Sequence, residues 1–122
     1  MTVKLVWHGT GVQCLYSGQC TINDIITAST QVKGNQNATS LTYCIHDFTQ
    51  AESLEAGSVA VAIIAVNMGT SLVNGAIRIG LAMSEAMASL SNARLHSSTA
   101  SRPTRVFNNG GDALAWALNT AA

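Results

Sequence analysis

The sequence predicts one α/β domain over residues 1–122, with a mostly parallel sheet of about five strands and about four covering helices. Two observations support this prediction. Strand-like and helix-like segments alternate in the order ββαβαβαβα, which is typical of parallel strands joined by helical crossovers. No repeat, charge block or proline-rich linker divides the chain, whose single proline is Pro103.

Two short alternating segments predict an N-terminal hairpin. Apolar residues occupy every second position in 3–7 and again in 12–16, and Gly9–Gly11 lies between the two segments. Ser17–Gly18 then ends the second strand. We expect this hairpin to form one edge of the sheet.

The first helix is predicted over Ile22–Lys33. Its apolar residues recur at helical spacing, and Thr21 with Asp24 forms an aspartate variant of the capping box. Gly34 follows and suits the C-terminal end of a helix.

The middle of the chain contains a strand and an ambiguous apolar segment. The alternating segment Leu41–Thr49 predicts a central strand. Residues 58–66 carry β-branched side chains at alternate positions, as a strand would, but the apolar stretch is too long for one strand. Length therefore favours a buried helix over Ser53–Met68, capped by Thr49 or by Ser53 itself.

Two further strands and two helices complete the predicted fold. Asn74–Gly75 predicts a turn, Ile77–Met83 the next strand, and Ser84 the cap of the following helix. A serine-rich loop, His96–Pro103, leads to a short strand over Thr104–Phe107. The helix after the Ser84 cap presents Met87, Leu90 and Leu95. The closing helix begins at Asn108–Asp112 and turns inward Ala113, Leu114, Ala117 and Leu118, with Trp116 beside them.

The composition argues against several classes of function. Apolar residues make up 48% of the chain and charged residues 10%, and six basic residues balance six acidic ones. Capture of nucleic acid or of an anionic membrane needs clustered basic residues, and here they are scattered. The apolar stretches are too short for a signal peptide or a membrane-spanning helix. We expect a cytoplasmic protein that binds no nucleic acid, inserts in no membrane and keeps Cys14, Cys20 and Cys44 as thiols.

Several segments, taken in order, carry a resemblance to a known family. The most specific part is the end of the chain, where Val106–Phe107 precedes Asp112–Leu118. The other segments are Ser17–Gly18, Thr21–Asp24, Tyr43–Asp47 and Arg78–Ala82. Together they resemble the STAS-like bacterial proteins related to anti-anti-sigma factors of the SpoIIAA type, whose last strand contains Val-Phe and whose closing helix follows the pattern Glu-Ala-x-x-Trp-Leu.

This resemblance implies a sheet of four or five strands backed by helices, often paired as a dimer. It implies use in protein interaction or in holding an apolar ligand rather than in a reaction. One motif departs from the family, which carries an Asp-Ser-Ser-Gly type turn with a phosphorylated serine after the central strand. This chain has Thr49–Leu54 there, and Ser53 is the nearest counterpart. The neighbouring Glu52 and Glu55 would oppose a phosphate.

Candidate chemical groups occur on the central strand. Cys44 and His46 share one face of the strand, because side chains repeat every two residues, and Asp47 points to the other face. A Cys–His nucleophile, or a zinc site formed with Cys14, would be the chemical alternatives. The sequence lacks the tight ligand spacing of a zinc site, so we expect a pair packed in the core, with no catalytic residue, metal or cofactor.

A binding site is expected where the central strand ends, since ligands of open parallel sheets bind beyond the strand C-termini. The residues predicted to line this site for a ligand or partner are His46, Asp47, Thr49, Ser53 and Ser84. Asp47 has an alternative local role, in which it hydrogen-bonds to the turn that follows.

The function predicted from the sequence is a small non-catalytic interaction or regulatory module. One alternative is a carrier of an apolar ligand or lipid, with a pocket between sheet and helices near Phe48, Met83 and Met87. Another alternative is a thiol enzyme that uses Cys44 and His46.

The apolar segment 58–66 predicts a homodimer. A helix in a small domain normally has one face in water, but this one is apolar on nearly every side. An isologous pair of these helices would cover the exposed stripe. We expect a dimer in solution that Ile63→Glu or Ile64→Glu weakens without unfolding the chain. Light scattering measures the molar mass, and a monomeric wild type would contradict the prediction.

Overall fold

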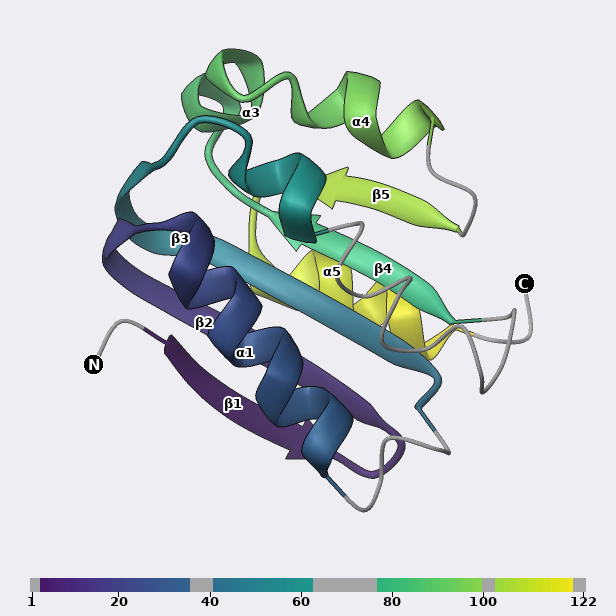
Figure 1. The fold of residues 1–122 in the computed structure, drawn as a ribbon. Coiled ribbons are helices and arrows are strands. Elements are labelled where there is room, and N and C mark those ends of the chain that lie inside the picture. The colour runs from purple at the N-terminus through teal and green to yellow at the C-terminus, as the bar shows by residue number, and fades with distance from the viewer. Residues whose placement is uncertain (1–2, 36–40, 63–76, 100–102, 120–122) are drawn as a thin grey trace.

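Five strands form one mixed sheet in the computed structural model, which describes residues 3–35, 41–62, 77–99 and 103–119 (Figure 1). Their order in space is β1-β2-β3-β4-β5, with β1 antiparallel to β2 and the other neighbours parallel. The strands are β1 Val3–His8, β2 Gly11–Cys20, β3 Tyr43–Leu54, β4 Arg78–Ala82 and β5 Thr104–Phe107. The helices are α1 Ile22–Gly34, α3 Glu85–Leu90, α4 Ala93–Thr99 and α5 Gly110–Leu118, and residues 58–62 are also helical. The predicted fold class, with a hairpin at one edge and β3 in the centre, is confirmed.

α1 begins as the sequence predicts. Thr21 Oγ1 accepts the backbone N–H of Asp24 at 3.2 Å, and the Asp24 carboxylate accepts the backbone N–H of Thr21 at 2.9 Å. These two bonds complete the capping box. The helix ends differently, because Gly34 is its last residue and Asn35 caps it with an extended backbone. Gly34 is therefore not used as a left-handed stop.

β3 is longer than predicted. It continues past the predicted end at Thr49 to Leu54, so Thr49 and Ser53 lie in the strand and neither of them caps a helix. The reason is its parallel pairing with β2, which extends to the end of both strands. Backbone pairing across the sheet thus overrides the local capping signals.

The helix predicted over Ser53–Met68 starts later, with helical residues from position 58. Gly57 precedes it with a φ of 85°, a left-handed conformation that favours glycine. Residues 63–76 lie outside the described part, and with them the predicted interface residues Ile63 and Ile64 and the predicted turn Asn74–Gly75.

The single helix predicted after Ser84 is two helices. Ser84 caps α3 as predicted, but Asn92 has a φ of 55° and breaks the helix before α4. Residues 96–99 therefore belong to α4 rather than to a loop. Leu90 is 87% exposed and Leu95 is 63% exposed, so neither packs in the core. The buried residues of the two helices are Ala88 and Ala93.

α5 is capped at both ends. Asn109 Oδ1 accepts the backbone N–H of Asp112 at 2.8 Å at its start. At its end the Arg78 guanidinium donates to the carbonyl of Trp116 at 2.7 Å, and it lies over the indole ring of that residue. The inward residues are Ala113 and Ala117, Leu114 and Trp116 pack beside them, and Leu118, predicted inward, is 58% exposed.

The sheet separates two apolar clusters. α1, the helical residues 58–62, α3 and α4 contribute to the cluster on one face, and α5 covers the other face (Figure 1). β3 supplies both clusters because its side chains alternate: Cys44 and Phe48 pack with α1, while Tyr43 and Ile45 pack with α5. None of the helices in the described ranges combines the length and apolar content needed to cross a bilayer.

Two glycines offer a matched test of this packing. A Cβ at Gly11 would overlap the Tyr43 ring, whereas a Cβ at Gly34 would meet nothing within 4 Å. We expect Gly11→Ala to lower the free energy of unfolding by about 1–3 kcal/mol, because the buried ring must move. Gly34→Ala should raise it by about 0.5–1 kcal/mol, because alanine is the better helix former. Urea denaturation measures both, and two variants of equal stability would contradict the prediction.

Candidate functional site

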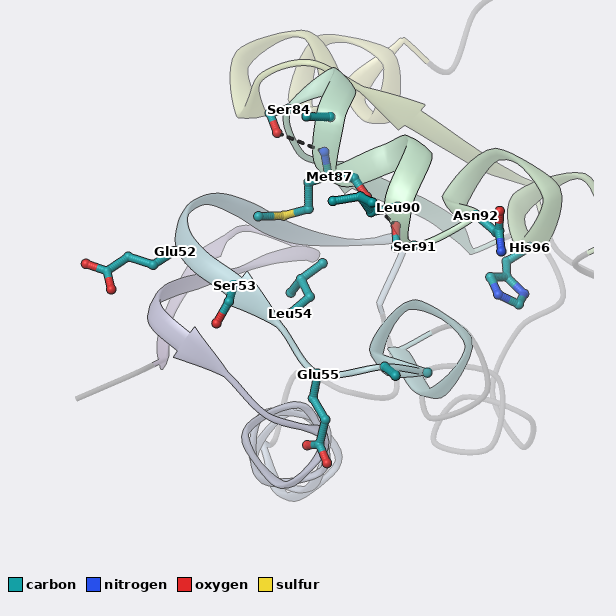
Figure 2. A pocket seen from close by; sticks show the side chains of 13 residues that line it. Glu52, Ser53, Leu54, Glu55, Ser84, Met87, Leu90, Ser91, Asn92 and His96 are labelled. Carbon is teal, nitrogen blue, oxygen red and sulfur yellow. Dashed lines mark hydrogen bonds between the residues drawn. The ribbon is translucent and has the colours of Figure 1, made fainter.

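A groove lies at the carboxyl end of the sheet, between the end of β3 and α3 (Figure 2). Its volume is about 640 Å³. We call it the β3–α3 groove. Its walls are residues 52–57 on one side and Ser84, Ala86, Met87, Leu90, Ser91, Asn92 and His96 on the other. The carboxyl ends of parallel strands are the usual place for binding sites, so this is the region that the sequence analysis indicates.

The groove exists because β3 extends beyond the end of β4. β4 pairs with β3 only over Tyr43–Asp47, and the chain then leaves the sheet and turns into α3. β3 stays paired with β2 as far as Leu54. The first part of β3 therefore has β4 as its neighbour on this side. The last part of β3 instead faces α3 across the groove.

Glu55 holds the β3 side of the groove in place. Its backbone N–H donates to the Cys20 carbonyl at 2.9 Å, and its carboxylate accepts the backbone N–H of Ile22 at 2.7 Å. A carboxylate at this position stabilises the start of α1. The Ser58 hydroxyl donates to the Glu55 carbonyl at 2.6 Å. This wall is thus bonded to β2, to α1 and to the helical residues that follow.

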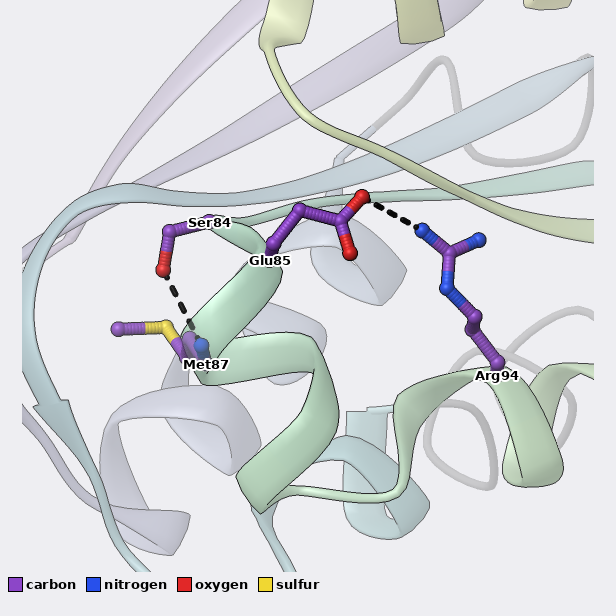
Figure 3. Close-up of polar contacts among 4 residues, drawn as sticks. All are labelled: Ser84, Glu85, Met87 and Arg94. Carbon is purple, nitrogen blue, oxygen red and sulfur yellow. Dashed lines mark hydrogen bonds and ion pairs between the residues drawn. The ribbon is translucent and has the colours of Figure 1, made fainter.

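Local hydrogen bonds hold the α3 side. Ser84 Oγ accepts the backbone N–H of Met87 at 3.1 Å, and Glu85 pairs with Arg94 of α4 at 3.0 Å (Figure 3). Both members of this ion pair are exposed, so it adds little stability, but it bridges the break between α3 and α4. The Met87 carbonyl accepts the Ser91 backbone N–H at 3.0 Å and the Ser91 hydroxyl at 2.7 Å, and these two bonds hold the end of α3.

Three large apolar side chains line the groove. Leu54 and Met87 are half-buried, with Leu54 directed toward α3, and Leu90 is 87% exposed (Figure 2). The other lining side chains are mostly small or polar. Glu52 and Glu55 are the acidic ones, and the lining contains no Lys or Arg. The site is therefore an open apolar strip with an acidic border.

The five residues predicted to bind a ligand or partner lie in three places. Ser53 and Ser84 line the groove. Asp47 and Thr49 bond to each other, since Asp47 Oδ1 accepts the backbone N–H of Thr49 at 2.9 Å and its hydroxyl at 2.6 Å. This is the local role that the sequence analysis gave as the alternative for Asp47. Asp47 also abuts Gly110 at the start of α5, where a Cβ would meet its carboxylate.

His46, the fifth of these residues, is fully buried in the core. The Tyr16 hydroxyl lies 2.9 Å from its Nδ1, and the Cys44 sulfur lies 3.8 Å from its Nε2. Its ring also stacks with the rings of Tyr16 and Phe48. Burial lowers the pKa of His46 to about 4, so the imidazole is neutral at neutral pH. Its place is the interior of the α1 face, away from the groove lining.

The cysteines are buried free thiols, as predicted for Cys14 and Cys44. Burial and the nearby carboxylates of Asp24 and Glu55 raise the pKa of Cys20 to about 12. A hydrogen bond with Cys14 and burial raise the pKa of Cys44 well above its usual value. Because the thiolate is the reactive form, these environments oppose reaction. Within the described ranges, no three His, Cys, Asp or Glu side chains gather closely enough to hold a metal ion.

Part of the groove was not predicted from the sequence. Leu90 was expected on one continuous helix, and no binding role was expected for Leu54 or His96. Asn92 was the available signal, because asparagine tolerates the left-handed conformation that ends α3. The predicted apolar pocket also differs from the structure. Phe48 and Met83 are fully buried in the core, and only Met87 of that set lines the groove.

Burial of neutral His46 makes the stability of the protein depend on pH. Its pKa is about 4 in the fold and 6.5 in the unfolded chain, so between these values the unfolded chain binds the additional proton. The free energy of unfolding should therefore fall as the pH drops from 6.5 toward 4, by up to about 1.4 kcal/mol per pH unit from this residue. Urea denaturation across this range should show a shallower dependence for His46→Gln. Parallel curves for the two proteins would contradict this assignment.

No protein-family model matches this chain, and among curated proteins none matches it. Solved structures share its fold. One is an anti-sigma factor antagonist from Mycobacterium paratuberculosis, with a TM-score of 0.68, 14% identity, and coverage of 95% of this chain and 92% of that one. Another is an uncharacterised DUF3478-family protein with a SpoIIAA-like fold from Shewanella loihica, with a TM-score of 0.60, 12% identity, and coverage of 93% and 90%. The chain therefore has a SpoIIAA-like fold, as the resemblance in its sequence implies.

Proposed function

We propose that this chain is a non-catalytic regulatory module that acts by binding another protein at the β3–α3 groove. The observation that carries the proposal is Leu90, which stands 87% exposed on α3 beside the half-buried Leu54 and Met87. A leucine alone on a surface needs no explanation, but an apolar strip along a groove is typical of a binding site. The fold supports the proposal, since one structure that shares it is an anti-sigma factor antagonist.

The position of the chemical groups favours binding over catalysis. Cys44 and His46 are the nearest approach to a nucleophile and its base, and both are buried in the core. Two of the polar side chains that a substrate at the groove would meet, those of Ser84 and Glu55, already hold local structure. Ser84 caps α3 and Glu55 caps α1. The groove is thus a stable surface that presents apolar contact area.

The same proposal includes the compartment and the self-association of the chain. The three free thiols fit the reducing cytoplasm. The dimer through the helix around 58–66 remains a prediction.

A pair of leucine substitutions tests the proposal. Leu90→Ser removes the most exposed apolar side chain of the groove, and Leu118→Ser is a matched change on α5, which covers the opposite face of the sheet. Both side chains are exposed, so both variants should fold. We expect Leu90→Ser to reduce capture of the principal partner from the native host by about tenfold and Leu118→Ser to leave it unchanged. Quantitative affinity enrichment measures this, and equal capture by all three proteins would overturn the assignment.

A further inference from the structure

The end of β3 has an unpaired edge, and this edge indicates how a partner binds. Resting on the function proposed above, we infer that the β3–α3 groove takes an extended segment of a partner protein, which adds to β3 as a further strand. Its aliphatic side chains pack against Leu54, Met87 and Leu90, and a Lys or Arg pairs with Glu52. Main-chain bonds to β3 supply affinity, and alternate side chains supply selectivity.

The unpaired edge follows from the strand registers. On one side, β3 pairs with β2 up to Leu54↔Cys20. On the other side, its last pair with β4 is Asp47↔Ala82. In the part of the chain that the structure describes, no strand pairs with this second edge beyond Asp47. The pairing with β2 shifts register between Gly18↔Ala51 and Gln19↔Ser53, so Glu52 lies at an irregularity in this stretch of the strand. The free edge is still extended backbone, and such an edge is a template on which a further strand adds.

Exposure and local bonding define the stretch that is available. Gln50, Glu52 and Ser53 are exposed, and Ala51 and Leu54 are half-buried. The backbone N–H just before this stretch, that of Thr49, is already held by the Asp47 carboxylate. The added strand therefore pairs with residues 50–54. Of these, residues 52–54 belong to one wall of the groove.

α3 supplies the side-chain contacts that a lone strand edge would lack. A strand added to β3 would lie between β3 and α3, where Met87 and Leu90 line the groove opposite Leu54 (Figure 2). Alternate side chains of an extended segment point to the same face, so residues two apart would meet this apolar strip. An amphipathic helix would use the strip but leave the strand edge unpaired.

The acidic side chains of the groove favour a partner segment that carries a positive charge. The groove lining holds two carboxylates and no Lys or Arg. One carboxylate, that of Glu55, is used on the first amide of α1. Glu52 is exposed, and its side chain points away from α3 (Figure 2). A basic side chain at the rim would pair with it, and an acidic segment would be repelled.

Selection of a random-peptide display library on the full chain tests this inference. We expect enriched peptides with aliphatic residues two apart and a Lys or Arg beside them. For the best synthetic peptide, Leu90→Ser and Glu52→Lys should each raise the Kd about tenfold, and Leu118→Ser should leave it unchanged. N-methylation of alternate peptide amides should weaken binding for one alternate set only, because only one set faces β3. Bound peptide should also slow hydrogen exchange of residues 50–54 about tenfold.

Several results would overturn the inference. Enriched peptides with apolar residues three and four apart would show a helical occupant. Binding that tolerates N-methylation at every position would exclude strand addition. An empty selection, or peptides whose affinity does not depend on Leu90, would remove the groove as a peptide site. In each case the enrichment experiment with Leu90→Ser still decides the proposed function separately, because a folded partner can cover Leu90 without adding a strand.

Discussion

The difference in length between β3 and β4 is the constraint on which the rest of the functional surface depends. β3 has 12 residues and β4 has 5, so β3 continues beyond the point where β4 leaves the sheet. The chain leaves β4 at Met83 and continues as α3, which lies across a groove from the end of β3. A groove with a strand edge on one side and a helix on the other follows directly from this mismatch.

The end of β3 must be held by contacts other than β4, and the sequence provides them locally. Asp47 binds the Thr49 amide and hydroxyl where β4 departs. Glu55 then ties the end of the strand to β2 and to the first amide of α1. The side-chain carboxylates of Asp47 and Glu55 thus accept the backbone N–H groups of Thr49 and Ile22, and Ile22 lies in the first turn of α1, where such groups have no partner within the helix. The groove can therefore be both open and ordered.

The polar groups of the α1 face serve the core rather than the groove. His46, Tyr16 and Cys44 form a buried chain of contacts beneath α1, and burial keeps the imidazole neutral. A buried polar network that is fully bonded rigidifies its surroundings, whereas an unpaired member would cost free energy. Cys44 and His46, the residue types that could act as a nucleophile and its base, therefore lie in the core and not in the β3–α3 groove.

The sequence by itself determined the fold class and most element types, because alternating and helical spacings are local properties. It identified the Thr21–Asp24 capping box, the Ser84 cap and the burial of Cys44 correctly. The tertiary structure alone decided where β3 ends, because pairing with β2 through Leu54↔Cys20 outweighs the capping signals of Thr49 and Ser53. It also decided that Ser53 and Ser84 share a groove, whereas the packing of Cys44 and His46 in the core was predicted from their positions on one strand face. The outcomes that the tertiary structure decided depend on strand register, which relates residues far apart in the chain.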